Sequence, residues 1–253
     1  MIMNDSEIKD AVRKSWDASS STYDTRPGHK ISTEAEKEAW KQELKRNLPP
    51  APLDILDVGC GTGAMGLLFA EMGHRVTGVD LSEAMMARAR EKAKAQNMAI
   101  ALKTGDAEHL PFEAGTFDVI VNRHLLWTLP HPEVALKEWH RVLKTGGTLS
   151  IIDGVWKDRS VSLRAKRLLS DGLARVFDPS SHSHYSKELR NQLPHDGGIP
   201  KETMTSFLER AGFSGIGFRD LMYIREMQKA QQPWYRRFVP QKTYYILTAK
   251  KQA

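Results

Sequence analysis

The chain has 253 residues, of which 40% are hydrophobic and 27% charged, and its formal net charge is +6. These values are ordinary for a globular protein with one large domain, or with one domain and an insertion. They leave room for an acidic partner, but a charge of this size does not define a function.

The cysteine content and the N-terminus bear on cellular setting. The single cysteine, Cys60, excludes an intrachain disulfide and favours a reducing, cytoplasmic setting. The first ten residues are charged and lack an apolar segment, so we expect no secretory signal. The apolar runs are too short to span a bilayer, so no membrane span is expected.

The first part of the chain predicts two helices. They are expected over residues 6–20 and 32–47. In the first, Ile8, Val12 and Trp16 are spaced four apart and form one apolar stripe. A proline-rich linker ends the second. We therefore interpret residues 1–50 as an N-terminal helical cap segment.

Beyond the linker, short apolar runs alternate with helical patterns. Strands are predicted over residues 53–59, 74–80, 99–106, 117–125 and 147–154. Helices are predicted between them over residues 64–73, 81–97 and 131–147, with Ser82 as an N-cap. This alternation implies right-handed crossovers and an α/β fold with a doubly wound, Rossmann-like, mostly parallel sheet.

The alternation lapses over residues 155–199 and resumes after them. The lapsed segment holds a basic helical stretch and a polar loop, so we predict a helical insertion, or lid, over the carboxyl edge of the sheet. Residues 199–213 predict a core-facing helix, because apolar side chains recur at i, i+3, i+4 and i+7 from Met204. Closing strands are predicted over 213–221 and 243–250, and the sheet domain as a whole comprises residues 51–154 and 200–253.

The stretch DILDVGCGTGAMG, residues 54–66, raises the question of which nucleotide-like ligand it binds. Three of its glycines fit the G-x-G-x-x-G pattern of dinucleotide sites, and Asp80 ends the following strand. However, Asp57 sits at the end of the first strand, where a carboxylate would repel a pyrophosphate. Asp106 adds a further carboxylate at the end of the third strand.

S-adenosylmethionine fits these residues better, because it has no phosphate and carries a sulfonium, an ammonium and a ribose diol. Bare glycine backbone allows close approach, and the amides that open the next helix can face its carboxylate. We expect Asp80 to accept from both ribose hydroxyls and Asp57 to favour the ammonium. Asp106 and the Ala107 amide would contact the adenine. The predicted cofactor-binding set is Tyr23, Asp57, Gly59, Cys60, Gly61, Gly63, Asp80, Leu81, Asp106, Ala107, Asn122 and His124.

Five segments, in this order and spacing, resemble the class I S-adenosylmethionine-dependent methyltransferases. The segments are LDVGCGTG (56–63), VTGVDLS (76–82), GDAEHLPF (105–112), FDVIVNRHLLWTL (117–129) and RVLKTGGTLSIID (141–153). The resemblance is to the small-molecule group that includes ubiquinone/menaquinone-biosynthesis enzymes; it covers residues 5–154 well and 200–250 loosely. It implies the strand order 3-2-1-4-5-7-6 with an antiparallel seventh strand.

The segment WDASSSTYD, residues 16–24, resembles the family's N-terminal segment, in which an aromatic residue closes over the cofactor. Tyr23 is the candidate for this residue, with its ring facing the sulfonium. Alternatively, Trp16 and Tyr23 only anchor the N-terminal helix to the core.

Methyl transfer from a sulfonium is an in-line displacement that depends on alignment and needs a base only if the nucleophile arrives protonated. His124, which follows the fourth strand, and His29 are the candidate catalytic bases. His195 is a further histidine to weigh, and each of the three could instead be a surface or supporting residue. The stretch SHSHY lacks a recognisable ligand set, so no metal site is predicted.

The sequence therefore predicts an enzyme that transfers a methyl group from S-adenosylmethionine to a small-molecule acceptor at O, N, S or C. Two alternatives stay open. One is a methyltransferase acting on RNA or another macromolecule, which the basic segments would favour. The other is an NAD-dependent oxidoreductase, which the glycine pattern would favour. We do not expect nucleic acid to be a partner, because there is no N/D-P-P-Y motif and no recognisable RNA-binding module.

Overall fold

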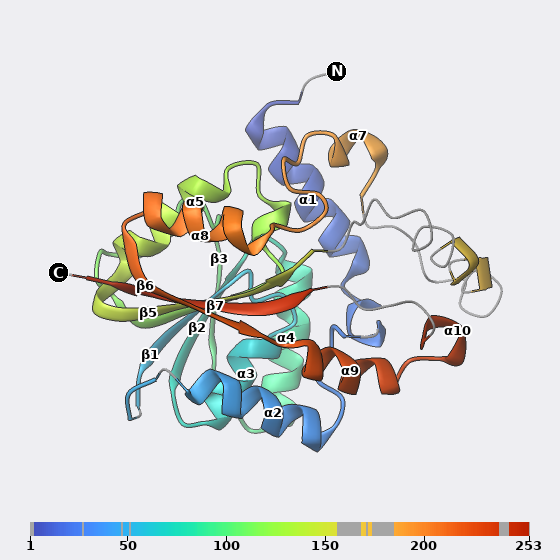
Figure 1. The fold of residues 1–253 in the computed structure, drawn as a ribbon, viewed down its shortest axis with the longest axis horizontal. Helices are drawn as coiled ribbons and strands as arrows, with labels where there is room; N and C mark the ends of the chain where they lie inside the picture. Colours follow the sequence, from blue (N-terminus) through green and yellow to red (C-terminus); the bar gives the residue numbers. More distant parts are fainter. Residues whose placement is uncertain are drawn as a thin grey trace.

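One seven-stranded sheet, with the order β3-β2-β1-β4-β5-β7-β6, organises the chain (Figure 1). The computed structural model describes residues 3–26, 28–46, 48–50, 52–155, 168–170, 172–173, 185–237 and 243–252. The strands are β1 (Asp54–Val58), β2 (Arg75–Asp80), β3 (Ala101–Thr104), β4 (Phe117–Arg123), β5 (Leu143–Gly154), β6 (Phe213–Asp220) and β7 (Tyr244–Lys251). The pairs from β3 to β5 are parallel, and β7 is antiparallel to both β5 and β6. The predicted strand order and antiparallel last strand are confirmed.

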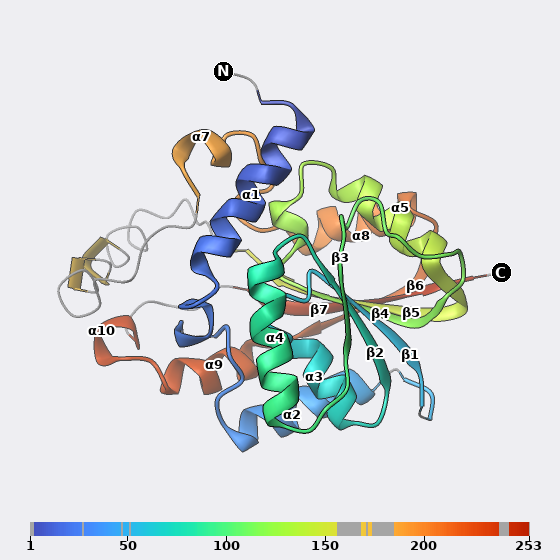
Figure 2. The same ribbon diagram turned by 180° about the vertical axis from the view of Figure 1, so that it is seen from behind.

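Helices cover both faces of this sheet, as Figures 1 and 2 show. They are α1 (Asp5–Ser19), α2 (Glu34–Lys45), α3 (Ala64–Glu71), α4 (Glu83–Ala95), α5 (Pro132–Val142), α7 (Lys187–Arg190), α8 (Lys201–Arg210), α9 (Met222–Ala230) and α10 (Trp234–Arg237), with short 3₁₀ turns η1 (Tyr23–Thr25) and η2 (Leu126–Thr128). Helices α2, α3 and α9 pack on one face, and α5 and α8 on the other. This two-sided cover is why the inner strands β1 and β4 are mostly buried and mostly apolar.

The predicted helix over 131–147 is too long. Helix α5 ends at Val142, and Leu143 already belongs to β5, where it pairs with Phe117. The carbonyl of Val142 accepts a hydrogen bond from Thr116 at 2.8 Å, so the chain leaves the helical path to join the sheet. Gly146, expected near the helix end, has a φ of +78° and lies within the bent start of β5.

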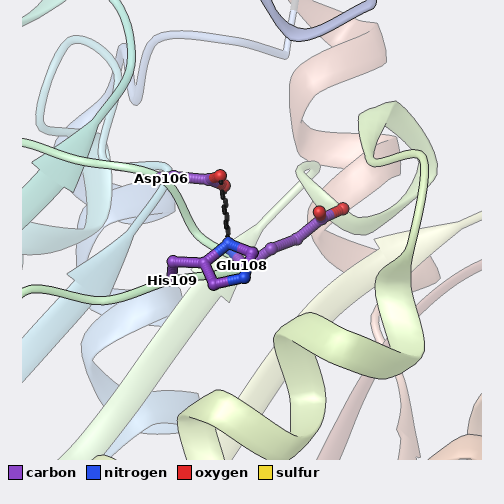
Figure 3. Close-up of side chains that lie close together, drawn as sticks. All are labelled: Asp106, Glu108 and His109. Carbon is purple, nitrogen blue, oxygen red and sulfur yellow. Dashed lines mark hydrogen bonds and ion pairs between the residues drawn. The ribbon is translucent and has the colours of Figure 1, made fainter. Parts of the chain in front are cut away.

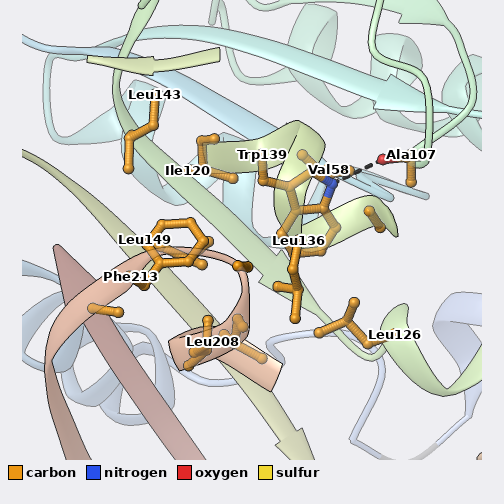
Figure 4. Close-up of a cluster of buried hydrophobic side chains, with 14 of the residues drawn as sticks. Val58, Ala107, Ile120, Leu126, Leu136, Trp139, Leu143, Leu149, Leu208 and Phe213 are labelled. Carbon is orange, nitrogen blue, oxygen red and sulfur yellow. Dashed lines mark hydrogen bonds between the residues drawn. The ribbon is translucent and has the colours of Figure 1, made fainter. Parts of the chain in front are cut away.

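The core on the α5/α8 face is centred on Trp139 (Figure 4). Its side chain is 0% exposed, and its indole nitrogen donates to the carbonyl of Ala107 at 2.9 Å. Because Ala107 follows β3, this hydrogen bond links the core to a loop at the carboxyl edge of the sheet. The predicted core-facing helix, α8, packs into the same cluster through Met204, Phe207 and Leu208.

The N-terminal segment divides between two places. Helix α2 packs on the sheet face through the fully buried Trp40. Helix α1 lies beyond the carboxyl edge of the sheet, beside α7 (Figures 1 and 2), and shares a small cluster with it through Ile8, Val12 and Leu189. Of the predicted insertion over 155–199, helical residues are described at 168–170, 172–173 and 187–190. The SHSHY histidines, His182 and His184, lie outside the described residues.

We predict that Trp139→Ala lowers the free energy of unfolding by about 3–5 kcal/mol, because it leaves a cavity in the core and an unsatisfied Ala107 carbonyl. Val134→Ala, on the exposed side of the same helix where Val134 is 43% exposed, should change it by less than about 0.5 kcal/mol. Urea denaturation of both variants measures the difference. Equal effects of the two substitutions would contradict this assignment of the core.

Candidate active site

A cavity of about 490 Å³ opens where the carboxyl ends of β1, β2 and β4 meet helix α1 and turn η1. Many of the residues predicted from the sequence line it together: Tyr23, His29, Gly59, Gly61, Asp80, Leu81, Asp106, Ala107 and His124. Others do not line it: Asp57, Cys60, Gly63, Asn122 and His195. The position is the one at which open α/β sheets bind ligands, outside the carboxyl ends of the strands where the strand order reverses.

The glycine-rich bend between β1 and α3 forms the floor of this cavity. Gly59 and Gly61 have φ values of +69° and +51°, which residues other than glycine seldom adopt. The amide of Gly59 donates to the carbonyl of Val79 at 2.8 Å, which holds the bend against β2. A Cβ added at Gly59 would lie 2.8 Å from Leu125, so the close packing also requires glycine there.

Asp80, at the end of β2, connects the bend to the start of the next helix. One carboxylate oxygen accepts from the amide of Gly61 and the other from the amide of Ser82, each at 2.8 Å. Each carboxylate oxygen has a second lone pair, so both can still accept from a ligand hydroxyl. Burial raises the pKa of Asp80 to about 6, although the hydrogen bonds from these amides oppose the rise. The carboxyl is therefore mostly ionised at neutral pH.

Asp57 supports the bend from beneath. Its side chain is 2% exposed, and its Oδ2 accepts from the amide of Gly66 in α3 at 2.8 Å. Burial raises the pKa of Asp57 to about 7. Asp57 therefore fixes the first turn of α3 and does not face the cavity.

The remaining predicted residues outside the cavity also shape the bend. The side-chain amide of Asn122 donates to the carbonyl of Val58 at 2.9 Å and ties β4 to the end of β1. Gly63 is the N-cap of α3, with a φ of +80°. Burial raises the pKa of the Cys60 thiol, which favours the unreactive protonated form. His195 packs on Phe207 with ring centroids 5.5 Å apart.

Asp106 lies in a small acidic cluster near the end of β3. Figure 3 shows it with Glu108 and His109, and their potential ligand atoms all lie within 4.8 Å of one another. The ammonium of Lys9 in α1 lies 2.7 Å from Asp106 and 2.6 Å from Glu108. Burial raises the pKa of Asp106, but the hydrogen bonds from Lys9 and from the Glu108 amide outweigh it, so the pKa is lowered. Lys9 supplies the cation of this cluster, and we assign no metal to it.

Aromatic rings close the cavity on the side of the N-terminal segment. Tyr23 packs edge-on against Trp16, with ring centroids 5.7 Å apart, and against His29, with centroids 4.3 Å apart. The carboxylate of Asp24, in the same turn, accepts hydrogen bonds from the hydroxyl of Thr62 in the glycine bend at 2.7 Å and from the ammonium of Lys92 in α4 at 2.9 Å. Turn η1 is thereby fixed to the sheet domain with the Tyr23 ring facing the cavity.

His124 follows β4 with a φ of +61°, a strained conformation for this residue type. Its ring stacks on Tyr244, with centroids 5.4 Å apart, and its Nδ1 lies 4.0 Å from Asp153. Burial, followed by the charges of Arg225 and Arg123, lowers the pKa of His124 well below its usual value. The ring is therefore neutral at pH 7, and its Nε2 lies 3.4 Å from the hydroxyl of Tyr244.

Asp153, on β5 behind His124, is fully buried. Its Oδ1 accepts from the amide of Gly154 at 2.8 Å, and its Oδ2 has no hydrogen-bond partner among the described residues. Burial raises the pKa of Asp153 to about 7. A carboxyl group in this position can stabilise a proton on the neighbouring imidazole.

Sequence reasoning missed the cationic part of the cavity, which is lined by Lys9, Arg26, Arg123, Arg190 and Arg225. These residues come from segments far apart in the chain, so no local pattern joins them. Arg123 carried one signal, since it is a charged residue at the end of an otherwise apolar, buried strand.

The cavity fits S-adenosylmethionine, the cofactor implied by the resemblance. Bare backbone at Gly59 and Gly61 faces the cavity, and Asp80 and Asp106 line it from two neighbouring strands. Carboxylates at these places accept from hydroxyl and amino groups, such as those of a ribose and an adenine. The donor and acceptor set is therefore that of an adenosyl amino acid.

Comparisons with known proteins agree. A methyltransferase domain family matches residues 56–151. The ubiquinone/menaquinone biosynthesis C-methyltransferase UbiE of Ruegeria sp. (strain TM1040) is 36% identical over 205 residues, covering 72% of this chain and 75% of that protein. The demethylmenaquinone methyltransferase of Staphylococcus haemolyticus (strain JCSC1435) is 33% identical over 217 residues, covering 83% of this chain and 89% of that protein.

Among solved structures, phosphoethanolamine N-methyltransferase 2 of Haemonchus contortus, in complex with phosphomonomethylethanolamine and S-adenosylhomocysteine, has a similar fold. The TM-score is 0.68 at 18% identity, covering 100% of this chain and 61% of that chain. Fold and site thus define a class I S-adenosylmethionine-dependent methyltransferase. The chain belongs to this family, in the group related to the ubiquinone/menaquinone-biosynthesis enzymes. This membership replaces the NAD-dependent oxidoreductase alternative.

Within the described part of the chain, none of the helices is both long enough and apolar enough to cross a membrane.

We predict that Asp80→Ala weakens binding of S-adenosylhomocysteine about 10- to 100-fold, because it removes a charged acceptor worth about 1.5–3 kcal/mol. Calorimetry measures the affinity, and thermal melting checks that the variant is folded. Glu91→Ala, which removes a carboxylate 64% exposed on α4, is the matched control and should bind as the wild type does.

The same carboxyl gives this prediction a pH dependence. Above a pKa of about 6 Asp80 is ionised and accepts fully, so wild-type affinity should decrease as the pH falls from 7 to 5. Asp80→Ala should show a weaker decrease. An affinity that is the same in both proteins, or a wild-type affinity that rises on acidification, would contradict the role of Asp80.

Proposed function

We propose that this methyltransferase acts on a small-molecule acceptor, with the methyl group transferred inside the cavity at the carboxyl ends of the strands. The observation that carries this is that the residues we assign to the cofactor and those we assign to the acceptor line the same cavity. Asp80 and Asp106 line one end, His124 and Arg123 line the other, and α1 with η1 lies over both. A cavity of about 490 Å³ covered in this way suits a small acceptor.

We assign the cofactor contacts residue by residue. Asp80 accepts from the ribose hydroxyls, and Asp106 with the amide of Ala107 contacts the adenine. Gly59 and Gly61 present backbone to the amino-acid part, beside Leu81 and Tyr23. The buried residues Asp57, Cys60, Gly63 and Asn122 act indirectly by holding the bend, since they do not line the cavity. When bound, S-adenosylmethionine supplies an electrophilic methyl group on a positively charged sulfur.

We assign His124 as the general base for an acceptor that arrives protonated. Its imidazole lines the cavity and is neutral, so it holds no proton before the acceptor binds. Because burial and the nearby arginines lower its pKa, proton transfer to it requires stabilisation of the imidazolium. Asp153, 4.0 Å behind Nδ1, would stabilise the imidazolium that forms. His29 also lines the cavity, but its carbonyl accepts from Arg123 at 2.6 Å and its ring packs on Tyr23, so we assign it to cavity closure.

The names of the relatives support a ring carbon of a quinol-type molecule as one acceptor for trial. One sequence relative is named a ubiquinone/menaquinone biosynthesis C-methyltransferase, and the other a demethylmenaquinone methyltransferase. Methylation of a phenol-bearing ring at carbon or oxygen is favoured by loss of the phenol proton, which is the step that His124 is placed to assist. Alignment in the closed cavity would supply roughly 7–11 kcal/mol of the rate enhancement.

We predict that methyl label from S-adenosylmethionine enters only molecules that pass a small-pore membrane when the enzyme is incubated with a bacterial extract. The reason is the size of the cavity, which at about 490 Å³ suits a small molecule. Scintillation counting of size fractions, with boiled enzyme as control, measures the distribution. Label recovered in RNA or protein would contradict the proposal and restore the macromolecular alternative.

We predict that His124→Asn lowers kcat by about 10²- to 10⁴-fold for an acceptor methylated at an ionisable group. Asparagine tolerates the positive φ of this position, so the backbone is kept while the base is lost. Affinity for S-adenosylhomocysteine should stay unchanged. The control is His131→Asn, at a histidine whose side chain is 47% exposed outside the cavity. A kcat within twofold of the wild type would remove His124 from the mechanism.

A further inference from the structure

The cavity is divided electrostatically along the sheet. Carboxylates line it at the ends of β2 and β3, where we place the cofactor, and Asp106 there is already paired with Lys9. Guanidinium groups line it beside β4 and α9, through Arg123 and Arg225. The end of the cavity that remains for the acceptor therefore carries positive charge.

Arg123 is the most informative of these groups. The residue is 9% exposed, and its Nη2 donates to the carbonyl of His29 at 2.6 Å. The guanidinium also interacts with the hydroxyl of Tyr244. Its Nη1 is buried and makes no geometrically good hydrogen bond to the described residues. Buried donors are normally hydrogen-bonded, so a donor of this kind on the wall of a cavity indicates that a ligand supplies the acceptor.

A second guanidinium reinforces this field. Arg225 in α9 stacks over the ring of Tyr244, 3.9 Å from its centroid, and donates to Gln228 at 3.0 Å. Burial lowers the pKa of Arg225, Tyr244 opposes this, and the nearby charge of Arg123 lowers it further. Arg123 is buried and Arg225 is half-buried, so these like charges destabilise each other, and an anion between or beside them would relieve that repulsion.

The charges that face this pair from the protein do not cancel it. Asp57 acts on Arg123 and Asp153 acts on Arg225, but burial raises the pKa of each of these carboxyls to about 7, so each is ionised only in part at neutral pH. Glu36 acts on Arg225 from α2, where its carboxylate accepts from Gln228 at 2.7 Å. The side chains of His124 and His29 carry no negative charge that could offset the two arginines. A net positive field therefore remains at the wall where Nη1 of Arg123 is unused.

We propose that Arg123, supported by Arg225, binds an oxyanion of the acceptor, either a carboxylate or a phenolate, next to the atom that receives the methyl group. This inference rests on the proposed small-molecule function and narrows its substrate to anionic acceptors. A planar guanidinium suits both oxyanions through parallel or single N–H donation. Arg123 directly precedes His124, so the group that binds the anion and the proposed base are fixed by the same strand end.

The test uses small aromatic probes with the complex of the full chain and S-adenosylhomocysteine. Benzoate and its neutral analogue benzamide are titrated by calorimetry. 4-Nitrophenol is titrated by absorbance, because its ionised form has a distinct visible band. We expect at least one anion to bind tenfold or more tighter than benzamide. Preference for benzoate alone indicates a carboxylate acceptor, and a gain of nitrophenolate absorbance alone indicates a phenolate.

Variants then assign the preference to Arg123. Arg123→Gln should reduce the affinity for the preferred anion at least tenfold while leaving benzamide and S-adenosylhomocysteine binding unchanged, and Arg123→Lys should retain part of the preference. Arg88→Gln, which removes the same charge from the exposed side of α4, is the matched control. Equal binding of anions and benzamide by the wild type, no binding of either anion, or a preference that survives in Arg123→Gln would overturn the inference. The proposed function would fail separately, through label transfer to macromolecules.

Discussion

The active site depends on how two carboxylates, the buried Asp57 and the half-buried Asp80, hold the glycine bend between β1 and α3. Asp57 accepts from the amide of Gly66 beneath the bend, and Asp80 accepts from the amide of Gly61 beside it. Glycines with positive φ would otherwise leave the bend conformationally free, at an entropic cost on ordering. Because these hydrogen bonds fix it in advance, the backbone can face the cofactor without rearrangement on binding.

Polar contacts also hold the N-terminal segment in place at the other end of the cavity. Arg123 donates to the carbonyl of His29, and the guanidinium of Arg225 lies close to the backbone of Gly28, so both arginines contact the segment that follows η1. Asp17 in α1 reaches Ser82 at 2.5 Å, and Lys9 reaches Asp106. The N-terminal segment is thus joined to the sheet by polar contacts at the site itself, which couples closure of the cavity to the charges that line it.

The sequence predicted most of the fold and part of the site, for identifiable reasons. Apolar runs and glycine punctuation defined the strands, and the strand-end carboxylates Asp80 and Asp106 do line one cavity. The sequence could place Asp57 near that cavity. It could not predict the direction of the Asp57 side chain, because that direction depends on how α3 packs over β1. Arg225 had no local signal, since its place in the cavity arises only when α9 packs beside β7. The end of α5 was misplaced because pairing of Leu143 with Phe117 overrides the local helical pattern.

We propose that the cavity binds an adenosyl amino acid in a single orientation, from the carboxylate side at β2 and β3 toward the cationic side at β4. A crystal structure of the protein with S-adenosylhomocysteine tests this most directly. The account predicts ribose hydroxyls on Asp80, adenine beside Asp106 and Ala107, and the sulfur directed toward Arg123 and His124. Adenine bound at the cationic side, or a ligand that does not contact the glycine bend, would contradict it.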